Sequence, residues 1–174
     1  MPRRYHPALV VLHWLLAACL IGLLIAGSLI LEPLANDDPA KLISFRLHMG
    51  LGLVTLFLMV LRLAVRLTTR QPALADTGSP LLDRLARANH WALYILAFVM
   101  AGSGIAFARA SGLPDAVFGS GPMPPDFDGL LARQLHGIAS KLLMALIALH
   151  IAAALWHQFV RRDGLMDRMR LGTR

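Results

Sequence analysis

The sequence predicts an all-α integral membrane protein whose four membrane-spanning helices form one bundle. Its 174 residues are 57% hydrophobic and 16% charged, with a mean hydropathy of +0.61. These values are more apolar than those of an ordinary soluble domain. The chain also contains four apolar stretches of the roughly 20 residues that a helix needs to cross a bilayer. Because one compact bundle takes up the whole chain, we expect a single domain over residues 1–174.

The first predicted helix covers residues 8–31 and contains no Asp, Glu, Lys or Arg before Glu32 and Pro33. It is too long for the core of a signal peptide and has no small-residue cleavage site before the turn, so we expect it to remain as a helix. The other three helices are expected at residues 44–67, 89–108 and 134–160. The connections 68–88 and 109–133 are rich in Pro, Gly and Asp, which is typical of loops outside the membrane.

The distribution of basic residues predicts the orientation of the bundle. Twelve arginines fall on the side of the two termini, whereas five basic residues fall on the opposite side. The positive-inside rule therefore predicts that the N- and C-termini are cytoplasmic. The two sets are Arg3, Arg4, Arg62, Arg66, Arg70, Arg84, Arg87, Arg161, Arg162, Arg168, Arg170 and Arg174, and Lys41, Arg46, Arg109, Arg133 and Lys141. Trp14, Trp91 and Trp156 fall at the cytoplasmic surface, where we interpret them as interfacial anchors.

The net charge of +7 does not indicate a nucleic-acid partner, because the basic residues cluster at helix ends that face anionic lipid headgroups. The single cysteine, Cys19, lies in the middle of the first predicted helix. The sequence therefore excludes an intrachain disulfide, a thiolate metal cluster and the Cys-x-x-Cys-His motif that attaches haem covalently.

The seven histidines are the main candidates for function, because an imidazole inside the bilayer is costly unless it is hydrogen-bonded, paired or bound to a metal. His136 and His150 are 14 residues apart on the fourth helix, so both point the same way, about 21 Å apart along its axis. This separation suits two haems, one in each leaflet. His48 at the outer level and His13 at the cytoplasmic level are predicted to supply the second axial nitrogens.

Three other histidines require separate interpretations. His6 and His157 lie near helix ends, where an imidazole is usually an interfacial polar group. His90 lies at the cytoplasmic level, where it competes with His13 as the partner of His150. Contact between His90 and a haem propionate or a quinone remains the alternative to axial ligation.

Glycines and basic residues follow the same spacing. Gly27 is 14 residues beyond His13, and Gly104 is 14 beyond His90, so a macrocycle or another helix can approach the backbone closely there. Arg62 is 14 residues beyond His48, with Arg66 one turn further along. Arg62 and Arg66 are candidates for contact with the propionates of the cytoplasmic haem, and Arg46, Arg133 and Lys141 with those of the outer haem. The alternatives are helix-packing glycines and arginines that extend to the interface.

Several short runs resemble the bacterial cytochrome b561 family, and the resemblance covers essentially the whole chain. The second helix also closes with Arg62-Leu63-Ala64-Val65-Arg66, as in that family. The histidine-bearing runs are Leu12-His13-Trp14-Leu15, Arg46-Leu47-His48-Met49-Gly50, Gln134-Leu135-His136-Gly137 and Leu149-His150-Ile151-Ala152-Ala153.

The resemblance implies two non-covalent haems b, one bound by His48 and His136 and the other by His13 and His150. It implies a multi-pass protein of the bacterial inner membrane that exchanges electrons with ubiquinone. For some members it also implies oxidation of periplasmic superoxide, which would make the chain an oxidoreductase of the superoxide:ubiquinone type. Cationic Arg46, Arg109, Arg133 and Lys141 are then candidates for steering the anion.

Two alternatives remain open from the sequence. A haem-bearing anchor subunit of a larger oxidoreductase, such as a hydrogenase or formate dehydrogenase, would carry the same haem sites. A transporter of metal ions or protons would use the histidines differently, but it normally has carboxylates within its helices. Here every Asp and Glu lies outside the predicted spans or at their ends.

Overall fold

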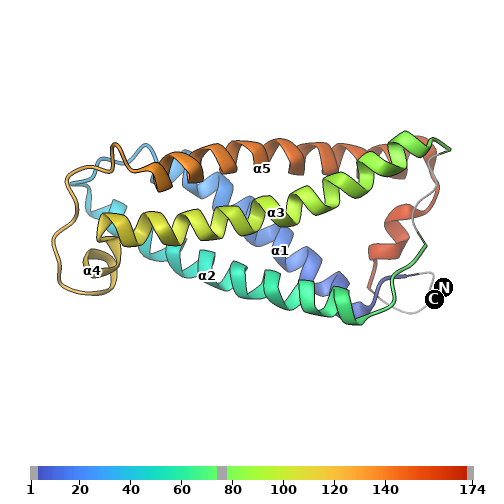
Figure 1. Ribbon diagram of the computed structural model, residues 1–174, viewed down its shortest axis with the longest axis horizontal. Helices are drawn as coiled ribbons and strands as arrows, with labels where there is room; N and C mark the ends of the chain where they lie inside the picture. Colours follow the sequence, from blue (N-terminus) through green and yellow to red (C-terminus); the bar gives the residue numbers. More distant parts are fainter. Residues whose placement is uncertain (1–3, 74–77, 172–174) are drawn as a thin grey trace.

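A computed structural model describes residues 4–73 and 78–171 and shows a bundle of long helices (Figure 1). Arg3 and Arg174, which contribute to the predicted charge asymmetry, lie outside the described residues. The elements in chain order are α1 (Pro7–Ala26), the π-helical η1 (Gly27–Leu31), α2 (Pro39–Thr68), α3 (Pro80–Ser111), the short α4 (Leu113–Phe118), α5 (Leu131–Leu155), the π-helical η2 (Trp156–Arg161) and the 3-10 helix η3 (Leu165–Met169).

The described residues contain four helices that are long and apolar enough to cross a membrane: Pro7–Leu31, Pro39–Thr68, Pro80–Ser111 and Leu131–Arg161. Large apolar side chains such as Leu29, Phe57 and Leu142 are exposed on the outside of the bundle. This arrangement is expected when the surrounding solvent is lipid. The predicted all-α, four-helix membrane fold is therefore confirmed.

The bundle has two distinct ends. We call the end that carries both chain termini the terminal end, and the opposite end, which carries α4 and the segment 119–130, the loop end (Figure 1). α1 packs closely on α2, and α3 packs closely on α5, whereas the two pairs approach each other less closely.

Helix boundaries depart from the sequence prediction in three places. α3 begins at Pro80 rather than Asn89. Ser79 and Pro80 start the helix, and Leu81, Leu82 and Leu85 lie in the additional turns before the predicted span. The predicted loop 109–133 contains α4, which follows Gly112 in the left-handed conformation. α2 also begins earlier, at Pro39, because the Asp38 side chain accepts a hydrogen bond from the Ala40 N–H.

Two buried apolar clusters shape the bundle. In the middle, all four long helices meet through Leu16, Leu24, Met59, Ala97 and Leu143. At the loop end, Phe45, Leu113, Val117 and Phe127 form a second cluster that joins α4 and the 119–130 segment to α2. The first cluster lies between the histidines of the loop end and those of the terminal end, and the second covers the loop end of the bundle.

The C-terminal segment folds back over the terminal end. The Trp14 indole N–H donates to the Met169 carbonyl at 3.0 Å, and Arg168 donates to the Ala73 carbonyl at 2.6 Å. Trp14, interpreted from the sequence as an interfacial anchor, is therefore hydrogen-bonded to η3. Trp91 contacts Arg66, whose guanidinium lies 5.8 Å above the indole ring.

Candidate functional site: two levels of paired histidines

At the loop end, α2 and α5 bring His48 and His136 together, with ring centroids 6.2 Å apart and ring planes at 75°. Both rings lie inside the bundle and are largely screened from solvent. The Nδ1 atom of His48 is buried and has no hydrogen-bond partner among the described residues. The structure thus joins the two side chains that the sequence predicted at the outer level.

The hydrogen bonds of His136 determine which of its ring nitrogens carries the proton. Its Nδ1 lies 3.0 Å from the Met100 carbonyl and 3.2 Å from the Ser103 hydroxyl. Because a carbonyl oxygen can only accept, Nδ1 must be protonated and must donate to Met100. In neutral His136 the Nε2 atom is then unprotonated and carries a lone pair. This tautomer can bind a metal through Nε2.

Two glycines bring helix backbone against these rings. A Cβ placed on Gly104 of α3 would lie 3.1 Å from Cε1 of His136, and one on Gly27 of η1 would lie 3.3 Å from Cε1 of His48. In both cases the nearest neighbour is a histidine ring rather than helix backbone. The sequence predicted that a macrocycle or another helix approaches these glycines, whereas the structure places the rings of the loop-end histidines there.

We expect Gly104→Ala to destabilise the loop-end site by about 1–3 kcal/mol, because the new methyl group overpacks the His136 ring. Thermal unfolding of the purified protein, followed by haem absorbance, measures this effect. Gly102→Ala is the matched control on the same helix, because a Cβ at Gly102 meets nothing within 4 Å. Equal stability of the two variants would show that Gly104 is not required for ring placement.

At the terminal end, His150 of α5 lies between two other histidines. Its ring centroid is 6.1 Å from that of His13 on α1 and 5.4 Å from that of His90 on α3. The ring planes meet at 69° and 71°, so the angle does not distinguish the two partners. The His13 distance matches the loop-end pair to 0.1 Å, whereas the His90 distance is shorter by 0.8 Å than the loop-end value of 6.2 Å.

Arg62 and Arg66 project from α2 into this terminal-end group. Arg62 donates through Nη1 to the Leu9 carbonyl at 2.6 Å, one helical turn before His13, and its guanidinium lies 6.0 Å from the centre of the Tyr94 ring. Arg66 lies over Trp91, the residue after His90. The structure therefore places both arginines at the level that the sequence predicted.

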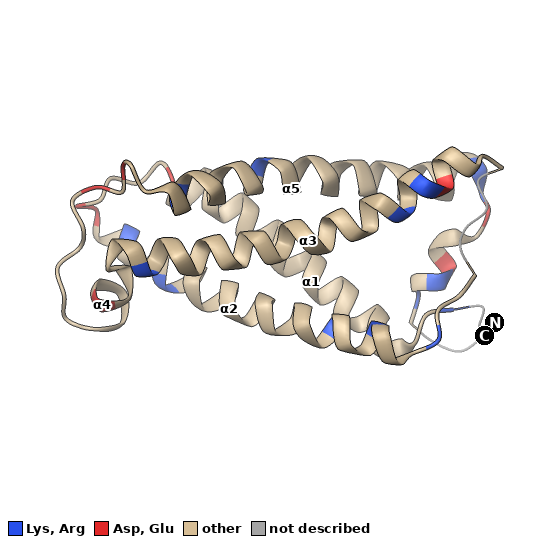
Figure 2. Ribbon diagram, in the orientation of Figure 1, with Lys and Arg blue, Asp and Glu red and all other residues tan. Residues whose placement is uncertain are grey.

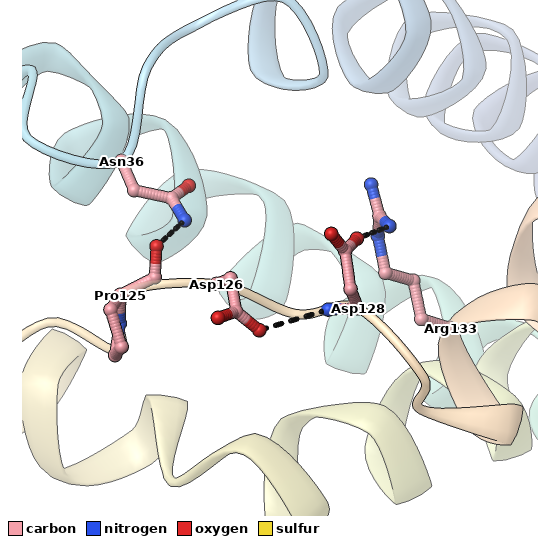
Figure 3. A network of polar contacts seen from close by, with 5 residues as sticks. All are labelled: Asn36, Pro125, Asp126, Asp128 and Arg133. Carbon is pink, nitrogen blue, oxygen red and sulfur yellow. Dashed lines mark hydrogen bonds and ion pairs between the residues drawn. The ribbon is translucent and has the colours of Figure 1, made fainter.

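The three basic residues predicted to contact the propionates of the outer haem differ in their partners and exposure. Arg46 donates from Nε and Nη2 to the Val117 carbonyl of α4, at 3.0 and 2.6 Å. Arg133 forms an ion pair with Asp128 at 3.1 Å, within the polar network of the 119–130 segment (Figure 3). Lys141 is exposed on α5. Arg46 and Arg133 thus have partners within the chain.

His6 and His157, interpreted from the sequence as interfacial groups, both have hydrogen-bond partners within the chain. His6 caps α1 by accepting a hydrogen bond from the Ala8 N–H at 3.3 Å. His157 contacts the Asp163 carboxylate at 2.5 Å. Burial acts to raise the pKa of Asp163, but the bonds from His157 and the Leu165 N–H, together with the charge of Arg161, hold that pKa below its ordinary value.

The histidine pairs fit a six-coordinate haem iron. An iron between two imidazole nitrogens, each bond about 2 Å long, places the ring centroids about 6 Å apart. The His48–His136 and His13–His150 distances agree with this value. The tautomer of His136 is also consistent with ligation through Nε2. The described residues contain no group of three or more His, Cys, Asp or Glu side chains arranged to hold a metal ion directly.

Two contributors to the site were not predicted from the sequence. Ser103 contacts both the Met100 carbonyl and His136, and Tyr94 faces Arg62 one turn beyond His90. The Gly102-Ser103-Gly104 run indicated a close approach but not the role of its serine. The four-residue interval between His90 and Tyr94 places both on one face of α3, and this was the available signal for Tyr94.

Comparison with known proteins identifies the family to which this chain belongs. Residues 4–172 match the family described as prokaryotic cytochrome b561. The chain is 30% identical to cytochrome b561 homolog 2 of Escherichia coli, over 97% of this chain and 92% of that protein. It is also 30% identical to the probable superoxide oxidase CybB of Yersinia pestis, over 97% of both chains, and 26% identical to cytochrome b562 of Cereibacter sphaeroides, over 92% and 90%. The chain therefore belongs to the prokaryotic cytochrome b561 family.

Proposed function

We propose that this chain is a di-haem b electron-transfer protein of the bacterial inner membrane, with both termini in the cytoplasm and ubiquinone as its electron acceptor. Membership of the family implies that it binds haem b. The observation that supports two haems is the recurrence of one geometry at two levels: paired imidazoles with centroids 6.1 and 6.2 Å apart. In this proposal His48 and His136 bind one haem, and His13 and His150 bind the other.

The chain's residues would hold, orient and shield these groups. A haem held by two of these imidazoles would supply transfer of single electrons rather than binding of a substrate to the iron. The Met100 carbonyl orients His136, and the buried loop-end cluster of Phe45, Leu113, Val117 and Phe127 would shield the loop-end site from water. Arg62 and Arg66 supply positive charge at the terminal end.

We further propose superoxide as the electron donor, based on the named activity of the Yersinia pestis relative. Two superoxide anions would each lose one electron to give two molecules of oxygen. Ubiquinone would take up both electrons and two protons to give ubiquinol. The reaction is balanced and needs no further reactant.

A dithionite-reduced minus oxidised spectrum of the purified protein, with pyridine haemochrome quantification, tests the haem content. We expect two haems b per chain, and oxidation of the reduced protein on addition of a short-chain ubiquinone. A chain that binds no haem under conditions in which it folds would contradict the proposal, and one haem per chain would contradict its di-haem part.

We expect the superoxide-dependent rate to depend only weakly on salt, because the loop end is not a positive surface. Among the described residues, five basic and six acidic side chains lie there, and Arg133 is already paired with Asp128. Electrostatic steering typically raises association rates by about tenfold or more and weakens steeply with ionic strength. Stopped-flow rates that change by less than about threefold as the salt concentration is raised would agree with this expectation. A steep fall would show that Arg46, Arg109 or Lys141 attracts the anion despite the nearby acids.

A further inference from the structure

Charge is distributed unequally between the two ends of the bundle (Figure 2). Among the described residues, the terminal end carries ten arginines and three aspartates, and the loop end carries five basic and six acidic side chains. Topology alone accounts for the exposed arginines, since positive loops face the cytoplasm. It does not account for the two arginines that lie inside the bundle beside the histidines.

Arg62 and Arg66 are held in place by uncharged groups. Arg62 is bonded to the Leu9 carbonyl and lies over Tyr94, and Arg66 lies over Trp91. Neither arginine has a carboxylate partner among the described residues. Both side chains are partly buried, so water and salt screen them less than surface charges. Their positive charges therefore act on the terminal-end histidine group without local compensation.

The basic residues of the loop end are placed differently. Arg133 is paired with Asp128, Arg46 is exposed and bonded to the Val117 carbonyl, and Lys41 is buried and donates to the Leu34 carbonyl. The proton on Nδ1 of His136 is donated to the Met100 carbonyl, which makes Nε2 a more basic, more electron-donating ligand. Among the described residues, the structure shows no such bond for His13 or His150. A more electron-donating ligand favours the oxidised form of a bound iron.

We infer that Arg62 and Arg66 hold the reduction potential of the terminal-end site above that of the loop-end site, and so give electron transfer a direction. One electron lost by the loop-end site, which is oxidised, is gained by the terminal-end site, which is reduced, and no proton moves in that step. Electrons would then enter at the loop end, and the quinone would be reduced at the terminal end. This inference rests on the proposed di-haem function and adds a direction to it.

Potentiometric titration of the purified holoprotein tests the inference. We expect two one-electron transitions in the wild type. The Arg62→Gln and Arg66→Gln variants should each lower the midpoint of the higher transition and leave the lower one nearly unchanged. Arg62→Lys and Arg66→Lys should restore most of the higher midpoint, because they keep the charge but lose the geometry of the guanidinium group. Arg133→Gln is the control at the loop end, where an ion pair is lost and the higher midpoint should stay unchanged.

The assignment of each transition to an end needs one further variant. His136→Ala, loaded with haem at the terminal end alone, should titrate with the higher midpoint. A match to the lower midpoint, or glutamine variants that move neither transition, would overturn the inference while leaving the di-haem function intact. A wild-type protein that lacks two haems by pyridine haemochrome would instead overturn the proposed function, so the two failures are distinguishable.

Discussion

Replacing His136 with alanine should lower the haem b content of the purified protein from two per chain to one. His136 is the α5 partner of His48, with ring centroids 6.2 Å apart, and its Nδ1 bond to Met100 leaves Nε2 free for the iron. Removing it would take away one of the two proposed axial ligands of the loop-end haem and the contact of α5 with Gly104. A haem bound at about 1,000 times its dissociation constant stabilises the fold by about 4 kcal/mol, so the melting temperature should also fall.

The measurement combines pyridine haemochrome with thermal unfolding. His48→Ala should have the same stoichiometry as His136→Ala, because both belong to one pair. His6→Ala is the control: His6 caps α1 at the surface, and its loss should leave both haems in place. Added imidazole should restore the second haem to His136→Ala if the vacated space is otherwise intact. Retention of two haems without imidazole would contradict the loop-end pairing.

The sequence was sufficient to predict the fold and the candidate histidines, because both depend on simple periodicity. Four apolar stretches indicate four spans, and the 14-residue interval between His136 and His150 places both rings on one face of α5. Depth along the helices then suggests partners for them. The same periodicity accounts for the contacts of Gly27 and Gly104, although it does not show whether each faces a ring or a backbone.

Hydropathy could not predict what lies outside the membrane-spanning segments. The first turns of α3 are too polar to be recognised as part of a span, yet Pro80 and the leucines after it form a continuous helix. α4 is only six residues long and depends on burial of Leu113 and Val117 against Phe45. Partners that are main-chain carbonyls, such as Met100 for His136 and Val117 for Arg46, have no sequence signature.

At the terminal end, His13→Ala should abolish the second haem, whereas His90→Ala should retain it. His150 can reach either ring, but only His13 reproduces the loop-end spacing, at 6.1 Å against 5.4 Å for His90. An iron with two nitrogen bonds of about 2 Å needs the wider spacing. His90 lies next to Trp91, over which Arg66 is held, so its loss should change the environment of the haem without removing a ligand.

Haem stoichiometry and the electron paramagnetic resonance spectrum of the oxidised protein separate these outcomes. His13→Ala should have one haem per chain, with no low-spin signal from the terminal end. His90→Ala should keep two low-spin haems, with at most a shifted midpoint potential at the terminal end. The reverse pattern would make His90 the ligand. It would also mean that the 6.1 Å separation of His13 and His150 reflects packing of α1 on the bundle rather than the coordination of an iron.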